Sequence, residues 1–133
     1  MVLVDSNVLL DVLGDDPVWG ESSAATLRRI GERELLSINP LVYAEVAARF
    51  TSVADLDSAM PGELFVRSPL PYAAGFLAGH AFRAYRRRGG TKTSPSSDFL
   101  IGAHAAVNGW RILTRDVRVY RSYFPSVELI VPG

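Results

Sequence analysis

Cysteine is absent from this chain of 133 residues, and histidine occurs only as His80 and His104. Without cysteine there are no disulfides, thiolate nucleophiles or sulfur-based zinc sites, and a reducing compartment is compatible. Both histidines lie in predicted helices among small or apolar residues, where we expect packing or surface roles. We expect the same of Trp19, Trp110 and the tyrosines. A metal site in this chain is therefore expected to use oxygen ligands.

Long apolar segments are also lacking. The longest one, residues 70–82, is too short to span a bilayer and contains Gly and His, so it predicts a buried helix. No basic leader precedes the first apolar residues, so no secretory signal is expected. The length suits a single domain over residues 1–133, without internal repeats. We therefore expect a cytoplasmic protein that has one active site and no membrane partner.

Neither sign of charge is in excess, but acids and bases occupy different halves of the sequence. Before Arg67 there are 4 basic and 11 acidic residues, and from Arg67 onward there are 10 basic and 3 acidic residues. This asymmetry indicates either an anionic partner for one surface or two faces that neutralise each other on folding.

Short apolar or β-branched runs alternate with segments of helical spacing. The predicted strands cover residues 2–4, 35–38, 64–66, 111–113 and 128–131. This alternation predicts an α/β fold with a mostly parallel sheet, covered by helices on both faces because parallel neighbours need crossovers.

Pro residues mark two predicted helix starts. Asn39-Pro40 offers an N-cap followed by proline at the first helical position, and Ser94-Pro95 repeats the pattern ahead of Asp98. We therefore expect Glu45 and Asp98 within or near the first turns of their helices.

Two acids follow predicted strands directly or closely: Asp5 follows the first strand and Asp116 the fourth. In an open parallel sheet, ligands bind beyond the carboxyl ends of the strands where the winding direction reverses. If these strands are neighbours, the two carboxylates converge there. The alternative for each acid is simply to cap the following helix.

Two more acids lie in predicted helices. Glu45 lies on or beside the inward-facing stripe around Val42, where an acid needs a partner unless it reaches the edge of the stripe. Asp98 opens the apolar and small segment 99–103, or else compensates a helix dipole. Carboxylates crowded within a few ångströms repel by of order 4 kcal/mol per pair. Shared protons, a basic residue or a divalent cation must then neutralise them, and an all-oxygen cluster suits Mg²⁺ or Mn²⁺.

The four acids lie in short motifs, which are Val4-Asp5-Ser6-Asn7, Tyr43-Ala44-Glu45, Asp98-Phe99-Leu100-Ile101 and Thr114-Arg115-Asp116. Their order and spacing over nearly the whole chain resemble the PIN-domain nucleases, especially the VapC-type toxins. The resemblance implies a single PIN-like domain with three α/β/α layers and a central parallel sheet of about five strands in order 3-2-1-4-5. In that order the first and fourth strands are neighbours.

The resemblance also implies a function, namely a Mg²⁺- (or Mn²⁺-) dependent endoribonuclease that is the toxin component of a type II, VapBC-like toxin–antitoxin system. The metal would activate water and neutralise phosphate oxygens. The implied partners are RNA, a cognate antitoxin and a second copy of the chain. The implied catalytic and metal-binding residues are Asp5, Glu45, Asp98 and Asp116, with Asn7 and Thr114 in supporting hydrogen bonds. Asp5 and Asp98 are the expected principal ligands.

Basic residues gather at the end of a long helix predicted over residues 70–88 and closed by Gly89-Gly90, and again around the fourth strand's end. They are candidates for contacts to RNA phosphates, or else form a solvated helix end that favours the local dipole. The first group is Arg83, Arg86, Arg87, Arg88 and Lys92, and the second is Arg115, Arg118 and Arg121. The residues assigned to RNA are Arg86, Arg87, Arg88, Lys92 and Arg115.

Two other functions fit parts of the sequence. A haloacid-dehalogenase-like phosphatase also places an Asp after its first strand, but Asn7 stands where its second acid is expected and Lys92 is the only lysine. A non-catalytic RNA-binding module would use the basic half and leave the acids structural. That interpretation leaves Glu45 unexplained.

Overall fold

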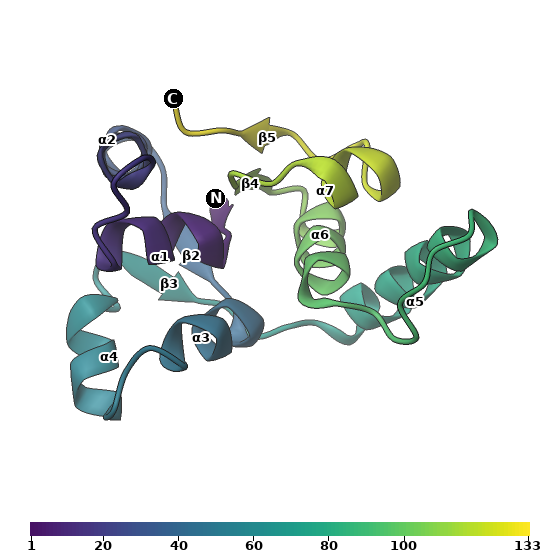
Figure 1. The fold of residues 1–133 in the computed structure, drawn as a ribbon, viewed down its shortest axis with the longest axis horizontal. Helices are drawn as coiled ribbons and strands as arrows, with labels where there is room; N and C mark the ends of the chain where they lie inside the picture. The colour runs from purple at the N-terminus through teal and green to yellow at the C-terminus, as the bar shows by residue number, and fades with distance from the viewer.

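Five short strands form the centre of the molecule (Figure 1) in a computed structural model that describes residues 1–133. The strands are β1 (Val2–Val4), β2 (Leu36–Ile38), β3 (Phe65–Arg67), β4 (Arg111–Leu113) and β5 (Leu129–Ile130). The helices are α1 (Ser6–Leu13), α2 (Gly20–Gly31), α3 (Pro40–Ala47), α4 (Val53–Ala59), α5 (Tyr72–Arg87), α6 (Ser97–Asn108) and α7 (Arg118–Tyr123). The five predicted strands are therefore confirmed, with bounds that differ only at their end residues.

The sheet is parallel throughout, and its strand order is β3-β2-β1-β4-β5. This order confirms the one implied by the resemblance. Val4 pairs with Leu113 across β1 and β4, and the Asp5 amide donates to the Leu113 carbonyl at 2.9 Å. The residues that follow β1 and β4 therefore leave the sheet side by side, where the winding direction reverses.

Helices cover both faces of this sheet. The chain winds outward from β1 to β3 through α1 to α4, and then returns through α5 and α6 to β4 on the other side of β1. Because parallel crossovers are right-handed, the reversal moves the later helices to the opposite face. Figure 1 shows α1 to α4 on one side of the molecule and α5 to α7 on the other. The predicted three-layer α/β/α architecture is confirmed.

Local caps explain where the two helices that carry acids begin. Asn39 caps α3, accepting from the amides of Leu41 at 3.1 Å and Val42 at 3.0 Å, and proline follows it as predicted. For α6 the predicted start is wrong, because Ser96 is the N-cap and Ser94-Pro95 lies ahead of the helix.

These starts place the two helical acids. Asp98 lies in the first turn of α6 as expected. Glu45 lies further along α3 than predicted, because five helical residues precede it from Pro40.

Helix α5 ends near the predicted glycines, and Gly89 has a φ of 89°. The helix predicted over residues 70–82 is present from Tyr72, but the prediction that it is buried is wrong. Only alanines of α5 are buried, whereas Tyr72 is 99% exposed and Phe76 is 72% exposed. The reason is that α5 packs mainly on α6, through its small-residue face. No helix of the chain combines the length and apolarity needed to cross a membrane.

Candidate active site

Asp5 lies at the carboxyl end of β1, in the centre of the sheet edge, and its residue is only 7% exposed. Its Oδ1 accepts the amide of Ser6 at 2.8 Å. Its Oδ2 accepts two hydroxyls, from Thr114 at 2.9 Å and from Tyr120 at 2.7 Å. Three donors from three segments of the chain therefore hold one buried carboxylate in place.

Burial nevertheless disfavours the charged form of this carboxylate. Burial raises the pKa of Asp5 more than the hydrogen bonds from Tyr120, Thr114 and Ser6 lower it, and the negative charge of Asp98 raises it further. Burial, together with the nearby Asp5 carboxylate, also raises the pKa of Tyr120 far above its ordinary value. The Tyr120 hydroxyl therefore stays protonated and acts as a donor.

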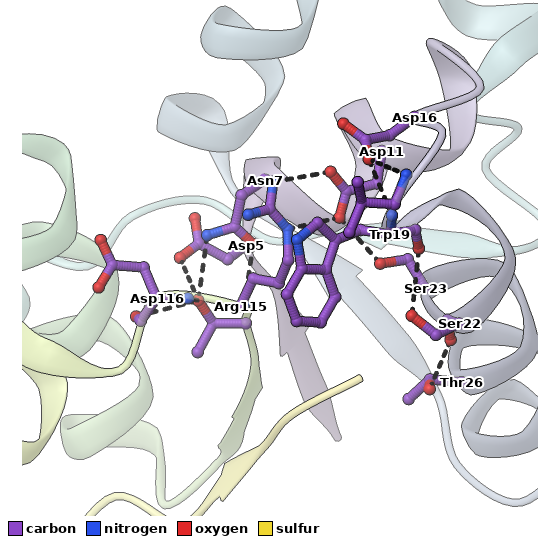
Figure 2. A network of polar contacts seen from close by, with 12 residues as sticks. Asp5, Asn7, Asp11, Asp16, Trp19, Ser22, Ser23, Thr26, Arg115 and Asp116 are labelled. Carbon is purple, nitrogen blue, oxygen red and sulfur yellow. Dashed lines mark hydrogen bonds and ion pairs between the residues drawn. The ribbon is translucent and has the colours of Figure 1, made fainter. Parts of the chain in front are cut away.

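Asn7 and Thr114, the two predicted supporting residues, connect this carboxylate to the β4 end (Figure 2). The Asn7 amide nitrogen donates to the Thr114 hydroxyl oxygen at 3.2 Å, and the Asn7 oxygen accepts the Arg115 amide at 3.1 Å. The Asp116 amide also donates to the Thr114 hydroxyl, at 3.1 Å. The loop after β4 is thus held against the start of α1.

Glu45 and Asp98 face Asp5 from two other helices. Partial burial raises the pKa of Glu45, the Ser97 and Ser6 hydroxyls lower it, and the negative charges of Asp5 and Asp98 raise it. Glu45 is itself exposed, so it lies at the edge of the apolar stripe, and Asp98 is half-buried. Three of the four predicted acids, contributed by the end of β1, by α3 and by α6, therefore lie near enough that their charges raise the pKa of Asp5 and of Glu45.

Asp116 differs from the other three acids. Both its carboxylate oxygens accept from the Arg118 guanidinium at 3.1 Å, and these hydrogen bonds lower the pKa of Asp116. Figure 2 shows its carboxylate turned away from Asp5. The predicted convergence of the Asp5 and Asp116 carboxylates is therefore wrong for this conformation. The backbones converge, but a nearby arginine determines where the Asp116 side chain points.

No three acidic or histidine side chains lie close enough together to ligate one metal ion. This is compatible with Mg²⁺, which keeps several waters and is commonly bound by one or two carboxylates plus substrate phosphates. The donors available at this edge are all oxygens, as a hard cation requires. The residues present therefore fit a hydrated Mg²⁺ or Mn²⁺ better than an ion enclosed by protein ligands.

A buried ion pair beside the site was not predicted from the sequence. Asp11 is 3% exposed and accepts two hydrogen bonds from Arg115, from Nε at 2.7 Å and from Nη2 at 2.8 Å. It also accepts the Ser23 hydroxyl at 2.9 Å, and the guanidinium stacks 5.3 Å from the centre of the Trp19 ring (Figure 2). Asp11 lies among the inward-facing apolar residues of α1, and that pattern was the available signal. The pair gives Arg115 a structural role, and its predicted RNA contact stays a prediction.

The other predicted RNA-binding residues are all exposed, but they differ in the contacts that they make. Arg86 donates to the carbonyls of Gly90 at 3.2 Å and Lys92 at 3.0 Å, which braces the loop after α5. The Arg88 guanidinium lies 4.9 Å from the centre of the Tyr123 ring. Lys92 donates to the Ser96 hydroxyl at 3.2 Å, at the start of α6 and therefore close in sequence to Asp98. Arg87 is exposed.

Solved structures with this fold cover almost the entire chain. The VapBC2 complex of Rickettsia felis bound to a DNA fragment from its promoter is 15% identical, with a TM-score of 0.75 and full coverage of both chains. VapBC-1 of nontypeable Haemophilus influenzae is 14% identical, with a TM-score of 0.73 and 98% coverage of each chain. FitAcB of Neisseria gonorrhoeae is 21% identical, with a TM-score of 0.66, covering 98% of this chain and 96% of the other.

The sequence itself also matches a family. No curated protein matches the chain. The family model for the PIN domain, however, matches residues 2–125. Together with the strand order and the acidic residues at the carboxyl edge of the sheet, this match shows that the chain is a member of the PIN domain family.

Proposed function

We propose that this chain is a divalent-metal-dependent endoribonuclease and the toxin of a VapBC-like, type II toxin–antitoxin system. The observation that carries the proposal is the buried, threefold hydrogen-bonded carboxylate of Asp5, facing Asp98 and Glu45 at the switch point of a PIN-domain sheet. The solved structures of similar fold, which include VapBC complexes, support the toxin assignment. A haloacid-dehalogenase-like phosphatase is not retained, because the chain belongs to another family.

In this proposal, Asp5 and Asp98 hold a hydrated Mg²⁺ or Mn²⁺, and Glu45 and Asp116 act through water bound to the ion. A bound divalent ion would supply Lewis-acid activation of water and neutralise charge on the phosphate. Glu45 stands at the exposed edge, where its carboxylate can accept a proton from the attacking water. For Asp116 to take part, its side chain must leave Arg118, and the substrate phosphate offers that arginine another anionic partner.

Substitution of the two principal acids tests the catalytic proposal. Asp5→Asn and Asp98→Asn should each lower RNA cleavage in Mn²⁺ by about 100-fold or more, because each removes a negative charge that would hold the divalent ion. Asp55→Asn, which changes an exposed acid in the first turn of α4, should cleave like the wild type. EDTA should abolish cleavage by the wild type. Full activity of either site variant, or cleavage that EDTA does not affect, would contradict the proposal.

Association of the chain with an antitoxin and with a second copy of itself follows from the same proposal. Mass in solution should correspond to a dimer, and co-expression with the product of the neighbouring gene should give a larger complex in which RNA cleavage is inhibited. A monomer that does not bind the product of the neighbouring gene would contradict the toxin assignment. The nuclease assignment would not be affected, because the acid substitutions test it separately. The cytoplasmic location stays a prediction.

A further inference from the structure

Tyr120 reaches the site from α7, and its hydroxyl makes the shortest of the three hydrogen bonds to Asp5, at 2.7 Å. The two residues are 115 positions apart in sequence, and Tyr120 is 1% exposed. Its ring packs within the hydrophobic core, and only the hydroxyl meets the carboxylate. A phenylalanine would fill the same ring volume, so the hydroxyl is the part of the side chain that packing does not explain.

A count of hydrogen-bond acceptors shows what this hydroxyl changes. An ionised carboxylate has about four lone-pair positions, two on each oxygen. Thr114 and Tyr120 both donate to Oδ2, which uses its two positions. The Ser6 amide uses one position on Oδ1. One position is then left, and it belongs to Oδ1.

We infer that Tyr120 is a positioning residue that orients the Asp5 carboxylate so that Oδ1 is the oxygen available to a divalent cation. The inference rests on the proposed function and deepens it. Tyr120 occupies a position on Oδ2 and restrains rotation of the carboxylate, because it donates from the side of α7. Thr114 alone would occupy one of the two lone-pair positions of Oδ2. The hydrogen bond from Tyr120 occupies the other.

The structure also shows why water does not simply replace this hydroxyl. Asp5 and Tyr120 are both buried, and α7 is docked on α6 through Phe124, which is 3% exposed. A buried carboxylate that loses a donor keeps its charge without the compensating hydrogen bond. Without the Tyr120 hydroxyl, we therefore expect the Asp5 carboxylate to become more mobile, because water does not take the place of the lost donor.

Tyr120→Phe tests the inference, with Tyr123→Phe as the matched control. The control removes the same atom from the same helix, in a half-buried tyrosine of the neighbouring aromatic cluster. Mn²⁺ binding to each metal-free protein is measured by titration, followed by electron paramagnetic resonance of the free ion. Tyr120→Phe should weaken Mn²⁺ binding by about 10- to 100-fold, the range found when a hydrogen-bond partner of a metal ligand is lost. Tyr123→Phe should bind like the wild type.

Three outcomes would overturn an assignment. Equal Mn²⁺ affinity of Tyr120→Phe and the wild type would overturn the role of Tyr120 while leaving the nuclease proposal intact. An equal loss in Tyr123→Phe would also overturn it, because the effect would then come from the aromatic cluster. A wild type that binds no Mn²⁺ and cleaves no RNA would overturn the proposed function itself. If Tyr120→Phe unfolds in buffer, the titration is repeated in sucrose, which favours the folded state, with the same criteria.

Discussion

At the residue scale, the main feature is a charged group placed where burial disfavours it. Asp5 is buried at the end of a fully apolar strand, and its three hydrogen bonds compensate only part of the lost hydration. Tyr120 faces it from α7, Asp98 from α6 and Glu45 from α3, and the two acids add repulsion. Such an arrangement opposes folding stability and favours cation binding.

The raised pKa of Asp5 predicts the pH dependence of stability in the metal-free protein. Because this pKa is higher in the folded than in the unfolded chain, the folded state holds the proton more tightly, and stability falls as pH rises through the raised pKa. In EDTA, Asp5→Asn should be at least as resistant to urea as the wild type at neutral pH. The wild type should gain stability relative to the variant as the buffer is made mildly acidic. A difference between the two proteins that is constant with pH would contradict the assignment.

At the scale of elements, close contact between α6 and α7 brings Tyr120 to the sheet edge. Gly102 of α6 faces the Phe124 ring at the end of α7, and a Cβ at position 102 would overlap that ring. Phe124 is buried, so the ring has little room to move aside. The absence of a side chain at Gly102 therefore lets α7 approach, and with it the hydroxyl that contacts Asp5.

Gly102→Ala should consequently destabilise the protein, although alanine is the better helix former. The overlap with Phe124 outweighs the propensity gain, and we expect a loss of about 1–2 kcal/mol in the free energy of unfolding. Gly75→Ala is the control, because Gly75 is exposed on α5 and an added Cβ meets nothing within 4 Å. It should raise stability by up to about 1 kcal/mol. Urea denaturation compares the two, and equal effects would show that close packing at Gly102 is unimportant.

At the scale of the whole molecule, the two halves of the sequence differ in charge and lie largely on different sides. The acidic first half supplies α1 to α4, and the basic second half supplies α5 to α7 (Figure 1). Asp11 with Arg115, and Asp116 with Arg118, neutralise part of the charge near the site. Exposed arginines remain on α5 after these pairs form. The unequal charge of the two halves is therefore better explained by an anionic partner than by mutual neutralisation.

Exposed arginines on α5 should therefore contribute to RNA affinity through salt-dependent contacts. Arg83→Ala combined with Arg87→Ala should weaken binding of single-stranded RNA and lower the slope of log affinity against log salt by about 0.7 per lost phosphate contact. Arg28→Ala with Arg29→Ala changes two exposed arginines at the end of α2, on the other side of the molecule, and should leave the slope unchanged. Fluorescence anisotropy over a salt series measures the slope for both double variants. Equal slopes would contradict the proposal that the α5 arginines contact RNA.

Patterns along the chain were sufficient to predict the strands and the capped start of α3. They also predicted that Asp5 and Asp116 follow the ends of two strands. Side-chain alternation and capping act over a few residues, so a single sequence contains them. The motifs around the acids also indicated the PIN family and its strand order, which the family match and the sheet confirm. The metal-binding and catalytic roles of the individual residues stay predictions.

Tertiary packing alone decided which side chains meet. Tyr120 donates to Asp5 across 115 positions, and Arg115 pairs with Asp11 across 104. The pair of Asp116 and Arg118 is local by contrast, since only two positions separate the residues. The long-range contacts depend on helix docking and on the space left by neighbours such as Gly102. Those are properties of the packed molecule, because hydrogen bonds and buried charges depend on distances that no local sequence pattern contains.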